Sequence, residues 1–164
     1  MAKVAVVMGS EHDLPVVRKA INALRELKIE CEVRVLSAHR SAEACAVFSR
    51  SARENGFGVI IAAAGKAAHL AGAIAANTVL PVIGLPIKGS TLDGMDALLS
   101  TVQMPSGIPV ATVAIDGAEN AALLAAEILA VSDEGLRAKL IEKREKALTA
   151  IQEADKRVRE EFEG

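Results

Sequence analysis

Short apolar segments alternate along the first 131 residues with longer segments whose apolar residues recur every three or four positions. The short segments are rich in Val and Ile, and we expect them to be strands at 4–8, 30–36, 59–63, 81–85 and 110–115. The longer segments are typical of amphipathic helices and cover 13–27, 41–55, 67–77, 92–103 and 118–131. This regular alternation predicts a parallel sheet with helices on both faces.

Several strand segments are apolar without interruption, as in "VAVV" at 4–7. Uninterrupted apolar strands are typical of sheets that are covered on both faces, whereas a strand with one wet face alternates between apolar and polar residues. The expected fold class is therefore α/β: a three-layer α/β/α sandwich around a doubly wound parallel sheet of the flavodoxin-like type.

The end of the chain departs from this alternation. From Asp133 onward it is dense in charge and free of proline, and its apolar residues form one stripe along a long helix. The stripe consists of Leu136, Leu140, Ala147, Ile151, Ala154, Val158 and Phe162. We expect residues 1–131 to form the α/β/α domain and residues 132–164 a helical extension that packs on a neighbouring subunit. A solvated helix with a frayed tail is the alternative.

Composition narrows the possible partners. A net charge of -2 gives no reason to expect nucleic acid or an anionic membrane, and 2% aromatic residues nearly exclude a base-stacking platform. Cys31 and Cys45 are expected to be reduced core residues. The chain has no leader sequence and no apolar run long enough to span a bilayer, so we expect a cytoplasmic protein.

Three polar loops are expected at the carboxyl edge of the sheet, where ligands of doubly wound folds bind. The first is "MGSEHDLP" at 8–15, whose backbone N–H groups could hold a phosphate. In it, Asp13 is placed to cap the following helix, and this structural role is the simpler interpretation.

The second loop, "SAHR", spans Ser37 to Arg40. An arginine can bind phosphate bidentately, a serine can add a hydroxyl, and an imidazole, with an ordinary pKa of about 6.5, suits proton transfer. A solvated Arg40 and a helix-capping His39 are the alternative. The third loop, "AAAGKAAHLAG" at 62–72, consists of small residues that let backbone approach a ligand, together with Lys66 and His69.

Other chemistry is disfavoured by what these loops lack. The three histidines are widely spaced, and no His-x-x-x-His or Cys-x-x-Cys pattern accompanies them, so we expect no metal. The sequence has no phosphate-binding Gly-Lys-Ser/Thr loop, no dinucleotide fingerprint and no nucleophile elbow. The residues therefore favour a site for a small phosphorylated molecule with a histidine available for acid–base catalysis.

In this combination the loops resemble the class I N5-carboxyaminoimidazole ribonucleotide mutases of purine biosynthesis, the PurE family. "VVMGSEHDLP", "VRVLSAHRSAE", "IIAAAGKAAHLAG" and "VQMPSGIPV" are similar to family segments in the same order. The second, carboxylating class of the family has Lys at the position of Arg40 and a different third loop, so the first class is favoured.

The resemblance implies a catalytic domain, spanning 1–131, that needs no cofactor and no metal. Such a mutase moves a carboxylate from the exocyclic nitrogen of an aminoimidazole ribonucleotide to ring carbon C4, by releasing and recapturing CO2. It further implies a homo-octamer in which the C-terminal helix contacts a neighbour. His39 would carry the proton, Ser37 and Arg40 would bind the phosphate, and Asp13 would hold the ribose hydroxyls.

The candidate catalytic residues are thus His39 and His69. The candidate substrate-binding residues are Gly9, Ser10, His12, Asp13, Ser37, Ala38, Arg40, Ala64, Gly65, Lys66, Ala67 and Leu70. The sequence departs from the family pattern at His12, in place of Ser, and at Ala63, Lys66 and Ala71, in place of Gly, Gly and Pro.

These departures leave two alternatives to the mutase. One is a related enzyme that acts on a different phosphorylated or carboxylated substrate. The other is a non-catalytic nucleotide-binding protein. Lys66 itself could hold an anionic group, could slow decarboxylation by stabilising the ground-state carboxylate, or could simply point to solvent.

Overall fold

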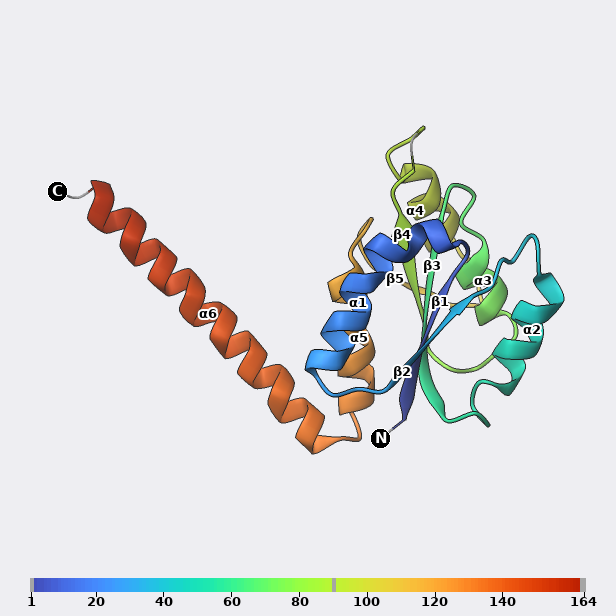
Figure 1. The fold of residues 1–164 in the computed structure, drawn as a ribbon, viewed down its shortest axis with the longest axis horizontal. Helices are drawn as coiled ribbons and strands as arrows, with labels where there is room; N and C mark the ends of the chain where they lie inside the picture. Colours follow the sequence, from blue (N-terminus) through green and yellow to red (C-terminus); the bar gives the residue numbers. More distant parts are fainter. Residues whose placement is uncertain (1, 90, 163–164) are drawn as a thin grey trace.

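A sheet of five parallel strands forms the centre of the computed structural model, which describes residues 2–89 and 91–162 (Figure 1). The strands lie in the order β2–β1–β3–β4–β5. Their bounds are β1 (Lys3–Met8), β2 (Cys31–Val35), β3 (Phe57–Gly65), β4 (Val82–Ile87) and β5 (Ala111–Thr112). This is the flavodoxin-like strand order, so the predicted doubly wound sheet is confirmed.

Helices cover both faces of the sheet and complete three layers (Figure 1). Their bounds are α1 (Leu14–Glu26), α2 (Ala42–Ser51), α3 (Leu70–Ala75), α4 (Met95–Val102), α5 (Ala118–Ala130) and α6 (Glu134–Phe162), with a short 3-10 helix, η1 (Glu11–Asp13), before α1. One apolar core joins α1 and α5 to the sheet, and a second joins α2 and α3 to the opposite face.

The central strand β1 shows why the strands are apolar throughout. Val4 and Val6 point into the core beneath α1 and α5, whereas Ala5 and Val7 point into the core beneath α2 and α3, and all four are fully buried. On β4, the absence of a side chain at Gly84 lets α4 approach closely, because a Cβ there would overlap the Thr101 methyl group.

Two helices begin later than the sequence periodicity predicts, because the backbone turns first. Lys66 has a φ of 58° and its carbonyl accepts a hydrogen bond from Ala68 N at 2.8 Å, so α3 begins at Leu70 rather than at residue 67. Asp93 and Gly94 have φ values of 53° and 90°, so α4 begins three residues later than residue 92.

The predicted strand at 110–115 was too long. Regular pairing with β4 is limited to Ala111 and Thr112. Beyond them, Val113 N still donates to the Gly84 carbonyl at 3.1 Å, and Asp116 N donates to the Pro86 carbonyl at 2.9 Å. The segment therefore stays attached to the edge of the sheet without keeping strand geometry.

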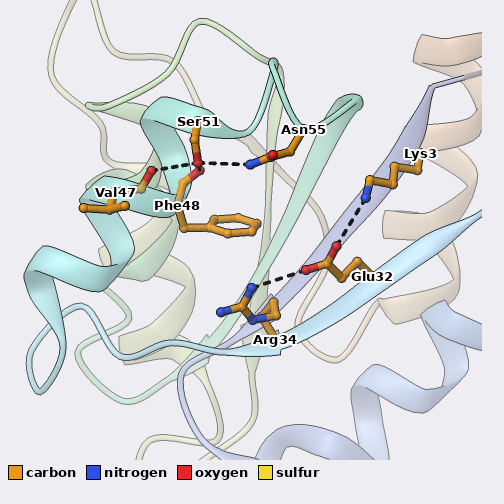
Figure 2. A network of polar contacts seen from close by, with 7 residues as sticks. All are labelled: Lys3, Glu32, Arg34, Val47, Phe48, Ser51 and Asn55. Atoms are coloured by element: carbon orange, nitrogen blue, oxygen red, sulfur yellow. Dashed lines mark hydrogen bonds and ion pairs between the residues drawn. The ribbon is translucent and has the colours of Figure 1, made fainter.

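At the other edge of the sheet, charged side chains line the outer strand β2 (Figure 2). Glu32 accepts hydrogen bonds from Lys3 Nζ and Arg34 Nη1, both at 3.3 Å, and these bonds lower the pKa of Glu32. The Lys3 ammonium also lies 4.4 Å from the centre of the Phe57 ring. Charges of this kind on an edge strand oppose pairing with the sheet of another molecule.

The long helix α6 begins in the core and then leaves it (Figure 1). Leu136 is fully buried, Leu140 packs at the margin of the core, and Lys139 Nζ donates to the Leu27 carbonyl at 3.0 Å. Farther along, Ile151 and Phe162 are 69% and 78% exposed. Packing of this stripe on a neighbouring subunit remains a prediction, as does the division of the chain at residue 131.

None of the helices in the described ranges is long and apolar enough to cross a membrane. Cys31 and Cys45 are both free thiols, the first half-buried and the second buried.

Burial of Leu136 predicts that α6 contributes to the stability of the whole domain. We expect Leu136→Ala to lower the free energy of unfolding by about 3 kcal/mol, because it leaves a cavity in a filled core. Val131→Ala is the control, because that side chain is 89% exposed, and it should change stability by no more than about 0.5 kcal/mol. Urea unfolding at one fixed protein concentration measures both. Equal stability of the two variants would contradict this role for Leu136.

Candidate active site

The carboxyl ends of β1, β2, β3 and β4 meet around one cavity of about 680 Å³. Every candidate site residue from the sequence lines it. The lining consists of Gly9, Ser10, His12, Asp13, Ser37, Ala38, His39, Arg40, Ala64, Gly65, Lys66, Ala67, His69 and Leu70, together with Ile87, Lys88 and Gly89. The structure thus brings the predicted residues together. Their roles in binding and catalysis remain predictions.

The loop after β1 is organised by Ser10. Its hydroxyl accepts a hydrogen bond from His12 N at 3.3 Å and lies 2.9 Å from His12 Nδ1, while its carbonyl accepts from Asp13 N at 3.1 Å. Gly9 N donates to the Ala63 carbonyl at 3.0 Å, which fixes this loop against the end of β3. The result is a polar turn in which Ser10 and His12 both line the cavity.

Asp13 occupies the N-cap position of α1, yet its carboxylate forms no capping hydrogen bond with the described residues. The sequence therefore predicted the N-cap position of Asp13 correctly, but the expected capping hydrogen bond is not formed in the described part of the chain. The carboxyl group is half-buried, and this burial raises its pKa, an effect that a backbone hydrogen bond at Ser10 partly offsets. A carboxylate that lines a cavity and is not used to cap its helix can accept hydrogen bonds from a ligand.

The loop after β2 holds Arg40 in one orientation. Ser37 Oγ accepts hydrogen bonds from Arg40 N at 3.1 Å and from Arg40 Nε at 3.4 Å. Arg40 Nη2 donates to the Gly9 carbonyl at 3.2 Å, so the guanidinium bridges the loops after β1 and β2. A planar donor group fixed in this way is suited to an anion such as a phosphate.

Two histidines from separate elements face each other at the cavity. His39 lies in the turn after β2, and His69 occupies the N-cap position of α3. Their ring centroids are 5.3 Å apart and the ring planes meet at 39°. Ser41, not His39, occupies the N-cap position of α2, so the helix-capping interpretation of His39 was wrong. An imidazole free of a capping role can exchange protons with a bound ligand.

The loop after β3 forms the wall next to β4. Gly65 is paired with Ile87, and a Cβ at Gly65 would lie only 3.2 Å from the Ile87 carbonyl oxygen. Ala63 and Ala71, two of the departures from the family pattern, are buried in the core and do not line the cavity. The other two, His12 and Lys66, do line it.

Sequence reasoning missed Ile87, Lys88 and Gly89, because it ended the fourth strand at Leu85. The signal that could have placed them was the Gly that follows the strand in "LPIKG", which marks a fourth loop at the same edge. Lys88 is held there by a 3.2 Å ion pair with Asp93, and its backbone N–H donates to Asp116 Oδ1 at 2.9 Å.

The cavity lining carries three permanent cations, Arg40, Lys66 and Lys88, against a single carboxylate, Asp13. An excess of positive charge in a cleft attracts anionic ligands. The described residues contain no group of three or more His, Cys, Asp or Glu side chains that could hold a metal ion. The protein is thus a flavodoxin-like α/β protein whose cavity has an excess of positive charge, which suits a small anionic ligand.

Comparison with known proteins identifies the family. A family model described as AIR carboxylase matches residues 3–150. An N5-carboxyaminoimidazole ribonucleotide mutase of Methanocaldococcus jannaschii is 51% identical over 159 residues, which cover 97% of this chain and 99% of that protein. A mutase of the same name from Mycobacterium tuberculosis is 55% identical over 139 residues, covering 85% of this chain and 80% of its own.

Among solved structures, that of Treponema denticola PurE is similar, with a TM-score of 0.86 and 29% identity. The match covers 94% of this chain and 96% of that one. The chain belongs to the AIR carboxylase family, and its resemblance to PurE proteins is confirmed.

The raised pKa of Asp13 predicts a cost to stability that depends on pH. Because its pKa in the folded state exceeds the ordinary value of 3.8, the ionised carboxylate destabilises the fold at neutral pH, and this penalty disappears as the pH falls below 3.8. We expect Asp13→Asn to be more stable than the unsubstituted protein at pH 7 and to lose this advantage near pH 3.5. Chemical denaturation at both pH values tests this, and a constant difference between them would contradict it.

Proposed function

We propose that the chain is an N5-carboxyaminoimidazole ribonucleotide mutase of purine biosynthesis. It converts N5-carboxyaminoimidazole ribonucleotide into 4-carboxy-5-aminoimidazole ribonucleotide, without a cofactor. The observation that carries this proposal is the 51% identity to a mutase of that name along nearly the full length of both chains. The geometry of the cavity supports the role of each residue.

His39 is the proton carrier in this proposal. Protonated His39 donates its proton to the exocyclic nitrogen as the bond from nitrogen to the carboxylate carbon breaks and CO2 leaves. Ring carbon C4 then attacks the CO2, forming the new carbon–carbon bond, and His39 removes the proton from C4. Atoms and electrons balance, because the product is an isomer of the substrate and the imidazole ends in its starting form.

The phosphate binds beside Arg40 and Ser37, and Asp13 accepts hydrogen bonds from the ribose hydroxyls. The hydrogen bond from Arg40 to the Gly9 carbonyl supports this assignment, because it fixes a cationic donor group before the ligand arrives. The role of Asp13 is supported by its half-buried carboxylate, which lines the cavity and does not cap α1.

His69 and the small residues at the end of β3 and just after it enclose the migrating carboxylate. CO2 is neutral and escapes readily, so its recapture requires that it stay near C4 in a confined space. The short side chains of Ala64, Gly65 and Ala67 leave room for this group beside the two imidazoles, which supports the assignment.

The protein assembles as a homo-octamer in the cytoplasm, with α6 of each subunit packed on a neighbour. Assembly is supported by the exposed apolar side chains on the outer part of α6, such as Ile151, Val158 and Phe162, which would gain from being covered. The reducing cytoplasm is supported by the free thiols of Cys31 and Cys45.

The proposal predicts turnover by the purified protein alone. Formation of the C4-carboxylated isomer from N5-carboxyaminoimidazole ribonucleotide is followed by ultraviolet absorbance, with no nucleotide cofactor or metal added. We expect His39→Asn to lower kcat by at least about 100-fold, because the proton carrier is removed.

Equilibrium binding of the C4-carboxylated nucleotide to His39→Asn is the control and should stay within a few-fold of the unsubstituted protein. Turnover that survives this substitution would refute the assignment of His39. Absence of turnover by a folded protein that still binds the nucleotide would favour the non-catalytic alternative.

The role of α6 is tested by ending the chain at Leu148. This truncation keeps Leu136 in the core and the 3.2 Å ion pair between Lys143 and Glu119, so the domain should still fold. We expect light scattering to report a smaller assembly than that of the full chain, while circular dichroism remains that of a folded α/β protein. An unchanged mass would show that the outer part of α6 is not needed for assembly.

A further inference from the structure

The backbone of Lys66 has a conformation that is unfavourable for residues other than glycine. Its φ of 58° lies in the left-handed region, which glycine adopts freely and other residues adopt at a cost. The residue follows the end of β3 and lines the cavity. Strained conformations are enriched at ligand sites, so a strained residue that also lines a cavity is a candidate for a role in binding.

Among the cavity cations, the Lys66 ammonium differs from the other two in its contacts with the described residues. Arg40 is bound to the Gly9 carbonyl and to Ser37, and Lys88 is paired with Asp93. Lys66 forms neither a hydrogen bond through its side chain nor an ion pair with any residue in 2–89 and 91–162.

Lys66 lies on the side of the cavity that is formed by β3. It precedes His69 by three residues in the turn closed by the hydrogen bond from Ala68 N to the Lys66 carbonyl, and His69 faces His39 across 5.3 Å. Arg40 and Ser37 belong instead to the loop after β2. Lys88 is already paired with Asp93, so the cavity offers two further cationic positions on different loops, Arg40 after β2 and Lys66 after β3.

We propose that the Lys66 ammonium binds the carboxylate of the substrate and makes the site selective for carboxylated over decarboxylated aminoimidazole ribonucleotides. This inference rests on the proposed function. A ligand with a phosphate and a carboxylate needs two cationic positions, and Lys66 supplies the second.

The chemistry of the reaction gives this assignment a kinetic consequence. The ammonium stabilises the carboxylate in substrate and product, and it gains nothing from neutral CO2 in between. Removal of the charge therefore weakens ground-state binding without weakening the state that follows carbon–nitrogen cleavage. KM should rise while kcat is retained or increases.

Binding to two ligands tests the proposal. The ligands are 4-carboxy-5-aminoimidazole ribonucleotide and its decarboxylated counterpart, 5-aminoimidazole ribonucleotide. Isothermal titration should show the affinity of Lys66→Met for the carboxylated ligand falling by about 10-fold, which is typical of losing a hydrogen bond to a charged group, with the other ligand within two-fold. Lys66→Gly should behave alike, and Lys66→Arg should restore most of the selectivity because it keeps a cation.

Lys28 offers a matched control for backbone strain. It is an exposed lysine with a φ of 60°, and it lies before the amino end of β2, whereas the cavity lies at the carboxyl ends of the strands. Lys66→Gly and Lys28→Gly both relieve a left-handed side chain, so both should keep or raise Tm, and only the first should change ligand selectivity.

Each other outcome overturns the assignment. If Lys66→Met bound both ligands with unchanged affinity, the ammonium would make no contact with the ligand. If the affinity for both ligands fell equally, the ammonium would contact a group that the two ligands share. Turnover and binding by the unsubstituted protein distinguish failure of the Lys66 inference from failure of the proposed function. If that protein turns over the substrate while the Lys66 variants keep full selectivity, only the Lys66 inference fails. If it neither binds nor turns over these nucleotides, both are rejected.

Discussion

The parallel hydrogen bonding of β1 to both of its neighbours is the constraint on which the site depends. Met8, the last residue of β1, is level with Val35 of β2 and with Ala63 of β3, and Gly65 of β3 is level with Ile87 of β4. This register ends four strands at one edge, so that loops separated by up to about eighty residues in the sequence open into the same space. The Asp13 carboxylate, the Arg40 guanidinium and the two imidazoles come together because each lies on a loop that follows one of these paired strands.

Much of the fold could be predicted because its strongest signals are local. Alternating strand and helix periods give the order of the elements, and unbroken apolar strands imply a sheet covered on both faces. The starts of two helices were wrong because they are set by backbone torsions at Lys66 and Asp93, which no periodicity reveals. The short β5 depends on hydrogen bonds with β4, and such nonlocal pairing lies outside the reach of a local pattern.

The candidate site was predictable as a set of loops, but its internal geometry was not. The register brings His39 and His69 together, whereas their separation depends on how α3 begins after the turn at Lys66. That Asp13 is free of capping, and that Arg40 bridges two loops, follow from side-chain orientations that sequence does not specify. The lysine of the fourth loop was missed because an extension of β4 by two residues carries the cavity past Leu85.

The strand order also has a consequence for how the chain folds as it is synthesised. After β1 and β2 have paired, β3 joins the free side of β1, β4 joins β3 and β5 joins β4, so these strands can be added in the order in which they are translated. Within the part of the chain that the structure describes, the last fully buried side chain to be made is Leu136, which completes the core against the helices that cover one face. A nascent chain can therefore form its ligand cavity before its core is complete. Until Leu136 leaves the ribosome, the incomplete core is accessible to chaperones and proteases.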